Sequence, residues 1–316
     1  MRGLTIATRG SKLALRQAEY IRALLADEHR LDIRLLVLKT RGDIIKNAPV
    51  SEMDGKGFFV REIEDALLDG RADLAVHSIK DLPMQLPAGL KLGAVPARAP
   101  AHDLLLSVRY PDLAALPEGA KVGTGSPRRR AQLLAERPDL DVSPLRGNVD
   151  TRIKKLERGD FAAVVMAAAG VARLGLCVTH MHELAPPHFL PAPGQGALGL
   201  EFRAERVDVE SMLDFLDDPQ TRICVEAERA FLDGLGGGCL APVAAFASCD
   251  GTPSSPLSLC GLLADPDGTR IIRQRQEGQA GEARALGLAL AESVLTAGGD
   301  EIISGIVRKP VKETER

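Results

Sequence analysis

Short apolar runs alternate with amphipathic segments through the first 76 residues of the chain. We expect strands at residues 4–8, 33–39 and 72–76, because each is a compact apolar run beside a turn or a polar segment. Apolar residues recur at helical spacing between the first two strands, and a second helical pattern covers residues 58–68. This alternation is typical of an α/β lobe with a mostly parallel sheet.

The same alternation restarts after a cluster of prolines and alanines at residues 95–100, which we interpret as a hinge. Helices are expected from Pro127 and from near Val149, between strands at residues 104–108, 121–123, 141–145 and 161–166. A second stretch rich in proline and glycine, residues 186–196, leads into a strand-like run at residues 197–201. We therefore expect the chain to cross back to the first lobe, making a two-lobed clamp with a cleft between the lobes.

The pattern changes after about residue 218, where a helix at residues 221–235 is followed by three glycines. Three strand-like runs and an alanine-rich helix at residues 282–296 complete the chain. The strands are expected at residues 240–247, 257–263 and 270–277, and the Asp-Pro-Asp-Gly sequence between the last two is typical of a hairpin turn. The predicted fold class is therefore α/β, with two α/β lobes and a C-terminal α+β domain that carries a small antiparallel sheet.

The two crossings set the expected domain bounds. Domain 1 takes residues 1–98 and 197–217, domain 2 takes residues 99–196, and domain 3 takes residues 218–316. A chain of 316 residues is long enough for three such units, because domains usually contain roughly 100–150 residues.

Composition narrows the classes of function. Forty lysines and arginines stand against 43 aspartates and glutamates, and the chain has no tryptophan and two tyrosines, so a nucleic-acid partner is disfavoured. The N-terminus lacks the apolar stretch of a secretory signal. The longest apolar run, about residues 161–172, is shorter than the roughly 20 residues that span a bilayer. We expect a cytoplasmic protein with neither a nucleic-acid nor a membrane partner.

The five cysteines are odd in number and form no C-x-x-C pair, which argues against a disulfide framework and a structural metal site. Cys239 follows three glycines, where the permissive backbone lets a side chain approach another molecule closely. Taken alone, Cys239 is by default a buried and inert thiol. The other cysteines lie in apolar or helical runs and are interpreted as small core residues.

Polar residues follow two strands of the first lobe. Arg9 and Ser11 stand where the first strand turns into a helix, which is a geometry that binds anions; an ordinary Ser N-cap beside a surface arginine is the alternative. Lys80 and Asp81 follow the buried strand at residues 72–76. A carboxylate beside a cation there can stabilise positive charge or move a proton, and the alternative is that Asp81 caps a turn while Lys80 is solvated.

A helix start is predicted where Ser126 serves as N-cap and Pro127 as the first helical residue. Three arginines, including Arg128 and Arg129, fall in its first turn and oppose the helix dipole, at a cost of roughly 0.3–1 kcal/mol each. A compensating anion is therefore expected. The G-x-x-x-x-G-K-[ST] pattern of a phosphate-binding loop is missing, which leaves a carboxylate or another anion.

Arg146, Arg152 and Arg173 also fall at strand ends or in early helical turns. Since guanidinium pairs bidentately with carboxylates, arginines from both lobes predict a cleft that holds several carboxylates. A non-catalytic two-lobed anion-binding protein and a nucleic-acid-binding module are the alternatives from other classes.

Taken together, these residues resemble the porphobilinogen deaminase (hydroxymethylbilane synthase) family. The resemblance covers nearly the whole chain in seven ordered motifs: ATRGSKLAL, GKGFFVREIE, DLAVHSIKDLP, GTGSPRRRAQL, LRGNVDTRI, PAPGQGALGLE and GGGCLAP. It implies two lobes like type II periplasmic binding proteins and a third domain that carries a dipyrromethane cofactor, joined by a thioether to Cys239.

The resemblance also implies a reaction and a set of site residues. Four porphobilinogen molecules condense with loss of ammonia, and water then releases the linear tetrapyrrole hydroxymethylbilane, as in heme biosynthesis. Asp81 matches the family aspartate that contacts pyrrole nitrogens and stabilises cationic intermediates. The positions that match binders of cofactor and substrate are Arg9, Ser11, Lys56, Lys80, Thr124, Ser126, Arg128, Arg129, Arg146, Arg152, Arg173 and Gln195. Lys56 falls in the glycine-containing segment of residues 40–57, which is expected to be a mobile loop.

The sequence departs from the family pattern at a few positions. Gly125 and Pro127 replace a serine and an apolar residue, which removes one hydroxyl, and Leu240 stands where a polar residue often follows the cysteine. None of these changes removes a reacting group. A small-molecule substrate and a monomeric cytoplasmic enzyme without a metal are expected.

Overall fold

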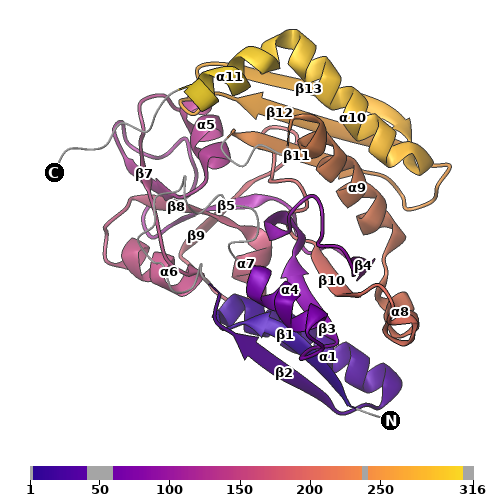
Figure 1. Cartoon of the computed structure of the whole chain (residues 1–316). Coiled ribbons are helices and arrows are strands. Elements are labelled where there is room, and N and C mark those ends of the chain that lie inside the picture. The colour runs from indigo at the N-terminus through magenta and orange to yellow at the C-terminus, as the bar shows by residue number, and fades with distance from the viewer. Residues whose placement is uncertain (1–2, 41–59, 237–240, 309–316) are drawn as a thin grey trace.

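The computed structural model describes residues 3–40, 60–236 and 241–308. Within them the chain forms three sheets with helices packed on their faces (Figure 1). Of the predicted loop at residues 40–57, only Thr40 is among the described residues. Lys56 and Cys239 lie outside them.

The first sheet has five strands with a parallel core. Across the sheet their order is β2 (Ile33–Leu38), β1 (Leu4–Arg9), β3 (Leu74–Ser78), β10 (Leu198–Arg203) and β4 (Leu90–Ala94). β1 pairs in parallel with β2 and β3, whereas β10 runs antiparallel to both of its neighbours. Its helices are α1 (Lys12–His29), α4 (Arg61–Leu68) and α8 (Val207–Leu213).

Alternation along these strands places helices on both faces of the sheet. Ile6 and Val76 face α1, where they pack with Ile21 in one apolar cluster. Ala7 and Ala75, one residue away in each strand, pack on the other face with residues of α4. A sheet covered on both faces is buried, which explains why these strands read as nearly continuous apolar runs.

The second sheet repeats this plan. Its order is β7 (Asp141–Pro144), β6 (Lys121–Thr124), β8 (Ala163–Ala167), β5 (Asp103–Ser107) and β9 (His180–Leu184). Helix α5 (Pro127–Glu136) packs on one face, and α6 (Val149–Glu157) and α7 (Ala168–Arg173) pack on the other.

The two five-stranded sheets share one topology. In each, three strands that follow one another in the chain run parallel in the order second, first, third. One antiparallel strand lies beside the third, and the next strand along the chain forms the edge. The antiparallel strands, β10 and β5, are those that the chain enters after crossing between lobes. This repeated topology confirms the predicted pair of α/β lobes.

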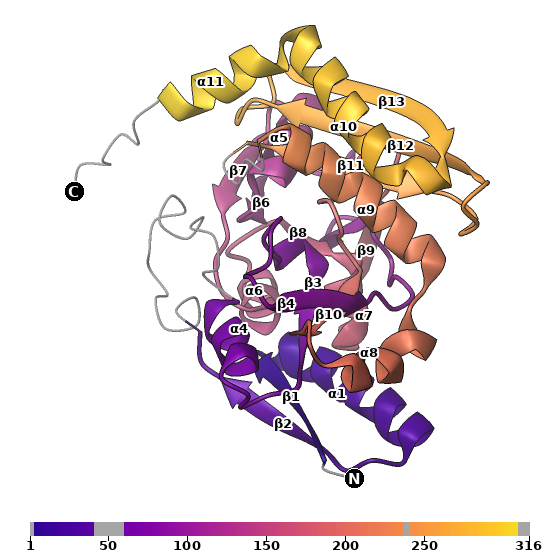
Figure 2. The ribbon, with the colours of Figure 1, turned by 45° about the vertical axis from the view of Figure 1, so that its right-hand side comes forward.

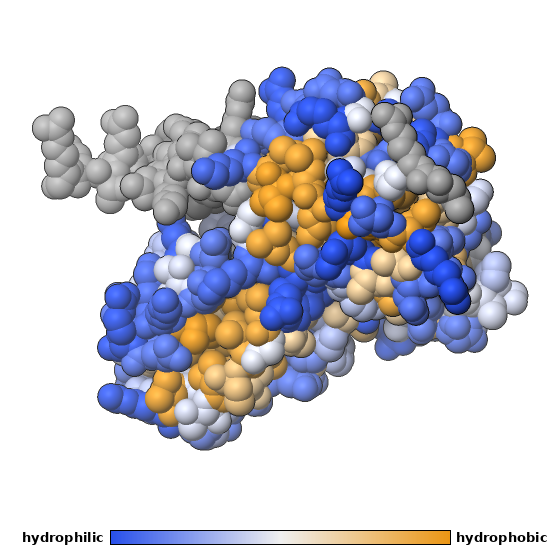
Figure 3. All heavy atoms as spheres, turned by 90° about the horizontal axis from the view of Figure 1, so that it is seen from below, coloured by the Kyte–Doolittle hydropathy of each residue, from blue (hydrophilic) through white to orange (hydrophobic). Residues whose placement is uncertain are grey.

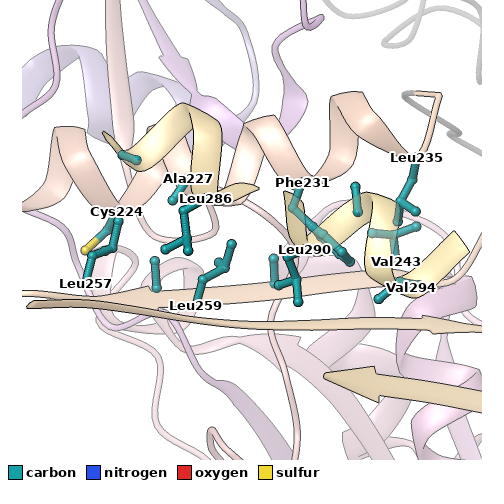
Figure 4. Packing of buried hydrophobic residues seen from close by; sticks show 14 of the residues in the cluster. Cys224, Ala227, Phe231, Leu235, Val243, Leu257, Leu259, Leu286, Leu290 and Val294 are labelled. Atoms are coloured by element: carbon teal, nitrogen blue, oxygen red, sulfur yellow. The ribbon is translucent and has the colours of Figure 1, made fainter. Parts of the chain in front are cut away.

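The third sheet is small and antiparallel, as predicted. It contains β11 (Val243–Ser248), β12 (Pro256–Ala264) and β13 (Ile271–Gln279), in that order. One face packs on α9 (Pro219–Gly234) and α10 (Ala283–Val294), with Phe231 and Leu290 at the centre of the core (Figure 4). Leu262 of the opposite face packs against Ala131 of α5, so this sheet lies between its own helices and the second lobe (Figure 2).

Several elements were not predicted from the sequence. The edge strands β4 and β9 are among them, and so are helices α7 and α8, which span seven residues or fewer. The end of the chain forms a further helix, α11 (Asp300–Arg308). Strand β3 ends at Ser78, two residues beyond the predicted end at residue 76. The domain bounds stay a prediction.

No helix within the described ranges is long and apolar enough to cross a membrane. Exposed apolar side chains such as Val207 and Val37 occur on the first lobe. Seen from below, the molecule carries apolar patches interrupted by hydrophilic residues (Figure 3).

The two crossings between the lobes lie against one another and are fixed by α9. The backbone N–H of Ala99 in the first crossing donates to the carbonyl of Gly196 in the second, 3.3 Å away. A side chain at position 196 would place its Cβ 2.3 Å from the carbonyl oxygen of Ala99, and the φ of Gly196 is +91°. Glycine is therefore required at this point of close approach.

Glu228 of α9 is fully buried and joins both crossings to the third domain. Its carboxylate accepts two hydrogen bonds from the Arg98 guanidinium, at 2.7 and 2.9 Å. It also accepts from the backbone N–H of Gly194, at 2.7 Å, and of Ala247 in β11, at 2.9 Å. A carboxylate with four donors is well satisfied, which offsets the desolvation of a buried charge.

We predict that Glu228→Gln destabilises the protein by about 3–5 kcal/mol, because it leaves the Arg98 guanidinium buried without a counter-charge. Urea denaturation measures this loss. Glu226→Gln is the matched control, since Glu226 lies on the same helix and is exposed. Equal unfolding midpoints for the two variants would contradict the assignment.

Candidate active-site cleft

Arg9 and Ser11 lie where β1 ends and α1 begins. The Ser11 Oγ accepts a hydrogen bond from the backbone N–H of Ala14, at 3.3 Å. Ser11 is therefore the N-cap of α1, as the alternative to an anion site predicted. Both residues also line a cavity of about 70 Å³. The cavity is lined further by residues at the end of β3 and by Asp81.

Asp81 ends a short 3₁₀ helix, Ile79–Asp81, that follows β3 directly. The backbone N–H of Leu82 donates to the carbonyl of Ile79, so the turn closes through its backbone rather than through the Asp81 side chain. That side chain is exposed and lines the cavity. Its carboxylate therefore faces a space that a ligand can enter.

Three parts of the protein hold this turn in place. The backbone N–H of Ile79 donates to the carbonyl of Ala197 at 3.1 Å, and the Gln17 amide of α1 donates to the Ser78 hydroxyl at 3.0 Å. From the third domain, the Arg229 guanidinium donates to three carbonyl oxygens of the turn, those of Ile79, Leu82 and Pro83. The position of Asp81 is thus fixed from both the first lobe and α9.

Lys80, beside Asp81, points to the second lobe. Its Nζ donates to the Gln195 Oε1 at 3.3 Å. The side chain is reached by solvent, yet surrounding protein removes enough water that burial lowers the pKa of Lys80 to about 8, against the opposing effect of Asp81. Lys80 is therefore a cation whose charge responds to pH in the neutral to alkaline range.

Asp103, at the start of β5, is the anion that compensates the charge of the arginines at the start of α5. Its two carboxylate oxygens accept hydrogen bonds from Arg128 and from Arg129, each at 2.7 Å. Gln195 donates to the same carboxylate at 2.8 Å. Burial by itself raises the pKa of Asp103, but the two guanidiniums outweigh it and hold this pKa well below its ordinary value.

This arrangement changes the interpretation of the arginine-rich helix start. Ser126 is the N-cap, as predicted, and its Oγ accepts from the backbone N–H of Arg129 at 3.4 Å. The Thr124 hydroxyl accepts from the backbone N–H of Ser126 at 3.2 Å. The anion predicted from the helix dipole is supplied by the chain itself, through Asp103.

The buried charges do not balance around Gln195. The buried guanidiniums of Arg128 and Arg129 share one carboxylate, that of Asp103, and the buried Nε of Arg129 has no hydrogen-bond partner. A buried donor without a partner is costly and marks a place for an acceptor. The cleft therefore favours an anionic ligand.

Two further arginines add to this positive charge. Burial first, and then the charge of Arg129, lower the pKa of Arg152 to about 10, and burial also lowers the pKa of Arg173. Arg152 donates to the carbonyl of Gly147 at 2.8 Å, and Arg173 donates to the carbonyl of Gly196 at 2.8 Å. Arg146 follows β7 and is exposed. Lys56 and Cys239 lie outside the described residues.

Comparison with known proteins identifies the family. The family model "porphobilinogen deaminase, dipyromethane cofactor binding domain" matches residues 4–211, and "porphobilinogen deaminase, C-terminal domain" matches residues 222–296. The chain belongs to the porphobilinogen deaminase family. It is 57% identical over 308 residues to a porphobilinogen deaminase of Nitratidesulfovibrio vulgaris strain Hildenborough, covering 97% of both chains. It is 49% identical over 309 residues to that of Chromobacterium violaceum, covering 97% of this chain and 99% of the relative.

Solved structures give weaker likenesses. A periplasmic VFT2 domain of Bordetella pertussis BvgS aligns over 67% of this chain and 84% of its own length, with a TM-score of 0.41 and 15% identity. An arginine-specific periplasmic binding protein of Salmonella typhimurium covers 70% of this chain and 94% of its own length, with a TM-score of 0.39 and 12% identity.

Membership of the porphobilinogen deaminase family confirms the predicted resemblance and the assignment as a transferase of tetrapyrrole biosynthesis. It also supports assembly of pyrroles, with a domain that binds dipyrromethane. Sequence reasoning missed the residues that support the site, among them Asp103, Gln17 and Arg229. Their partners lie 25 or more residues away in the chain, so local spacing gave no signal.

We predict that Asp103→Asn costs about 3–5 kcal/mol of stability at pH 7, because it leaves two guanidiniums buried without a counter-charge. Since the folded-state pKa of Asp103 is lowered, its contribution is present above its ordinary pKa and is lost as pH falls towards the folded value. Urea denaturation at pH 7 and pH 3 should therefore show a smaller difference from wild type at pH 3. Asp160→Asn, at an exposed ion pair, is the control, and an equal loss in both variants would refute this role.

Proposed function

We propose that the chain condenses four porphobilinogen molecules, with loss of ammonia, onto a dipyrromethane held through a thioether to Cys239, and then releases hydroxymethylbilane by hydrolysis. Membership of the family supports this reaction. The observation in the structure that carries the proposal is the exposed carboxylate of Asp81, at the edge of a cleft with a buried excess of positive charge.

The residues of the cleft fit a dipyrromethane, whose side chains end in carboxylates. Arg129 has a buried Nε without an acceptor, and the Lys80 Nζ is within reach of solvent. Both are donors that pair well with carboxylates. When bound, the dipyrromethane supplies the nucleophilic pyrrole carbon to which porphobilinogen is joined.

Asp81 has the electrostatic role in this proposal. Loss of ammonia from porphobilinogen leaves positive charge on the pyrrole, and a fixed carboxylate near the ring nitrogen stabilises it. The turn that carries Asp81 is tied down by Gln17, Ala197 and Arg229, so the carboxylate is held in place before the reaction. A preorganised charge of this kind needs no reorganisation when the reaction begins.

The binding residues divide by what they already contact. Arg128 and Gln195 are committed to Asp103 and to backbone carbonyls, so we assign them to holding the cleft together. Arg129 also donates to Asp103 and to the carbonyl of Val165, but its Nε has no acceptor, so we assign that nitrogen to a ligand carboxylate. We assign direct contact with substrate or cofactor carboxylates likewise to the other positions: Arg9, Ser11, Lys56, Lys80, Thr124, Ser126, Arg146, Arg152 and Arg173.

The mass of the denatured protein tests the covalent attachment. We predict that it exceeds the sequence mass by one dipyrromethane, and that Cys239→Ala abolishes the excess. Cys177→Ala is the control, because Cys177 is an exposed cysteine that the proposal does not use. An unmodified mass for protein that turns over porphobilinogen would refute attachment at Cys239.

Substitution of Asp81 tests the electrostatic role. We predict that Asp81→Asn still carries the dipyrromethane but lowers kcat by about 100-fold or more, since one preorganised charge is removed from the transition state. The rate of ammonia release and the intact mass measure the two effects. Asp69→Asn, at an exposed aspartate of the same lobe, should match wild type. Near-normal turnover by Asp81→Asn would contradict this role.

A further inference from the structure

Three titratable side chains meet on the α4 face of the first sheet, behind the cavity that contains Asp81. They are Glu64 of α4, His77 of β3 and Glu201 of β10, and they are 6%, 5% and 0% exposed. None of them has a role in the function proposed above. Ionisable residues are seldom buried to this degree unless they are paired, so the cluster needs an explanation.

The cluster is incompletely satisfied. His77 Nε2 lies 2.9 Å from Glu201 Oε2, but neither atom has a partner with hydrogen-bond geometry. The buried Oε1 atoms of Glu64 and Glu201 also have no hydrogen-bond partner. Such unpaired buried oxygens cost stability, and each retains the capacity to accept a proton.

The surroundings of Glu64 favour its neutral form. Burial, and then the neighbouring Glu201 carboxylate, raise the pKa of Glu64 to about 7, against the opposing effect of His77. Asp65 on the same helix adds a smaller effect in the same direction. Arg9, at the end of β1, lines the adjoining cavity, while Lys91 of β4 pairs with Glu210 of α8.

His77 connects this cluster to the site. It lines the same cavity as Asp81 and Arg9, and it immediately precedes the Ser78 that leads into the turn of Asp81. His77 therefore borders the space for substrate, and its Nε2 lies beside the buried carboxylate of Glu201. This is the arrangement of a proton relay between a cavity and a buried acceptor.

We propose that Glu64, His77 and Glu201 form a proton-accepting cluster that serves the condensation through His77. The inference rests on the proposed function. When two pyrroles are joined, the α-carbon of the terminal pyrrole forms a C–C bond to the methylene carbon from which ammonia has left. The C–H bond of that α-carbon then breaks, its electron pair restores the aromatic ring, and the proton leaves. That proton passes by way of the cavity and His77 to the carboxylates of the cluster, which are Glu201, 2.9 Å from His77 Nε2, and its neighbour Glu64. It returns to solvent or to the released ammonia before the next cycle. A base whose affinity for protons suits neutral pH is best placed for this task.

The pH dependence of turnover tests the proposal in the cofactor-loaded enzyme. The wild-type kcat should rise with pH as Glu64 ionises, whereas Glu64→Gln should lack this rise with little change in KM. The ratio of wild-type to variant kcat should grow by roughly tenfold between pH 6 and pH 8, as expected for one group that titrates near 7. Glu64→Asp should keep the rise, because it retains a carboxylate. Asp69→Asn, at an exposed residue just past the end of the same helix, should follow the wild type.

Thermal unfolding gives a readout that does not depend on activity. Because the folded-state pKa of Glu64 is raised, its stabilising contribution is present below its ordinary pKa of 4.5 and is lost as pH rises through about 7. The Tm of wild type relative to Glu64→Gln should therefore fall between pH 5 and pH 8. A constant difference would show that Glu64 does not hold the proton, and would overturn the proposal.

The outcomes separate this inference from the proposed function. If Asp81→Asn is inactive but Glu64→Gln keeps the wild-type pH profile, the relay fails and the proposed function stands. If Asp81→Asn turns over normally, the proposed role of Asp81 fails. His77→Gln, which removes the ring from the cavity, should also lose the rise with pH. If it keeps the rise, the relay is refuted.

Discussion

The buried carboxylate of Glu228 is the interaction on which the arrangement of the lobes depends. It binds the Arg98 guanidinium of the first crossing, the Gly194 backbone of the second and the Ala247 backbone of the third sheet. Three separate parts of the chain therefore share one charge. Removing it would leave donors unpaired in all three, so the crossings and the third domain are positioned together rather than independently.

The next residue of α9 extends this coupling to the proposed chemistry. Arg229 donates to carbonyls of the turn that carries Asp81, so consecutive residues of one helix fix both the hinge and that turn. In the chain, Cys239 follows shortly after the end of α9 at Gly234. The helix that leads to the proposed attachment residue thus also sets where Asp81 stands.

Sequence patterns predicted the parts of this protein that depend on local physics. Ser126 caps its helix and Pro127 begins it, because short-range backbone geometry decides both. The identity of the anion facing Arg128 could not be predicted, because Asp103 reaches it only through the pairing of β5 in the second sheet. Edge strand β9 was missed for a similar reason, since its sequence, His-Met-His-Glu-Leu, has a weak apolar pattern and the strand is defined by its pairing with β5.

The contacts between the lobes differ in strength from one end of the cleft to the other. At the mouth, Lys12 of α1 pairs with Asp150 of α6 at 3.2 Å, but Lys12 is largely exposed, and exposed pairs contribute about 0–1 kcal/mol. At the crossings, Glu228 is buried, and the largely buried Arg98 donates to it through two nitrogens. The Lys12–Asp150 pair therefore opposes separation of α1 from α6 only weakly, whereas the Arg98–Glu228 pair holds the crossings strongly.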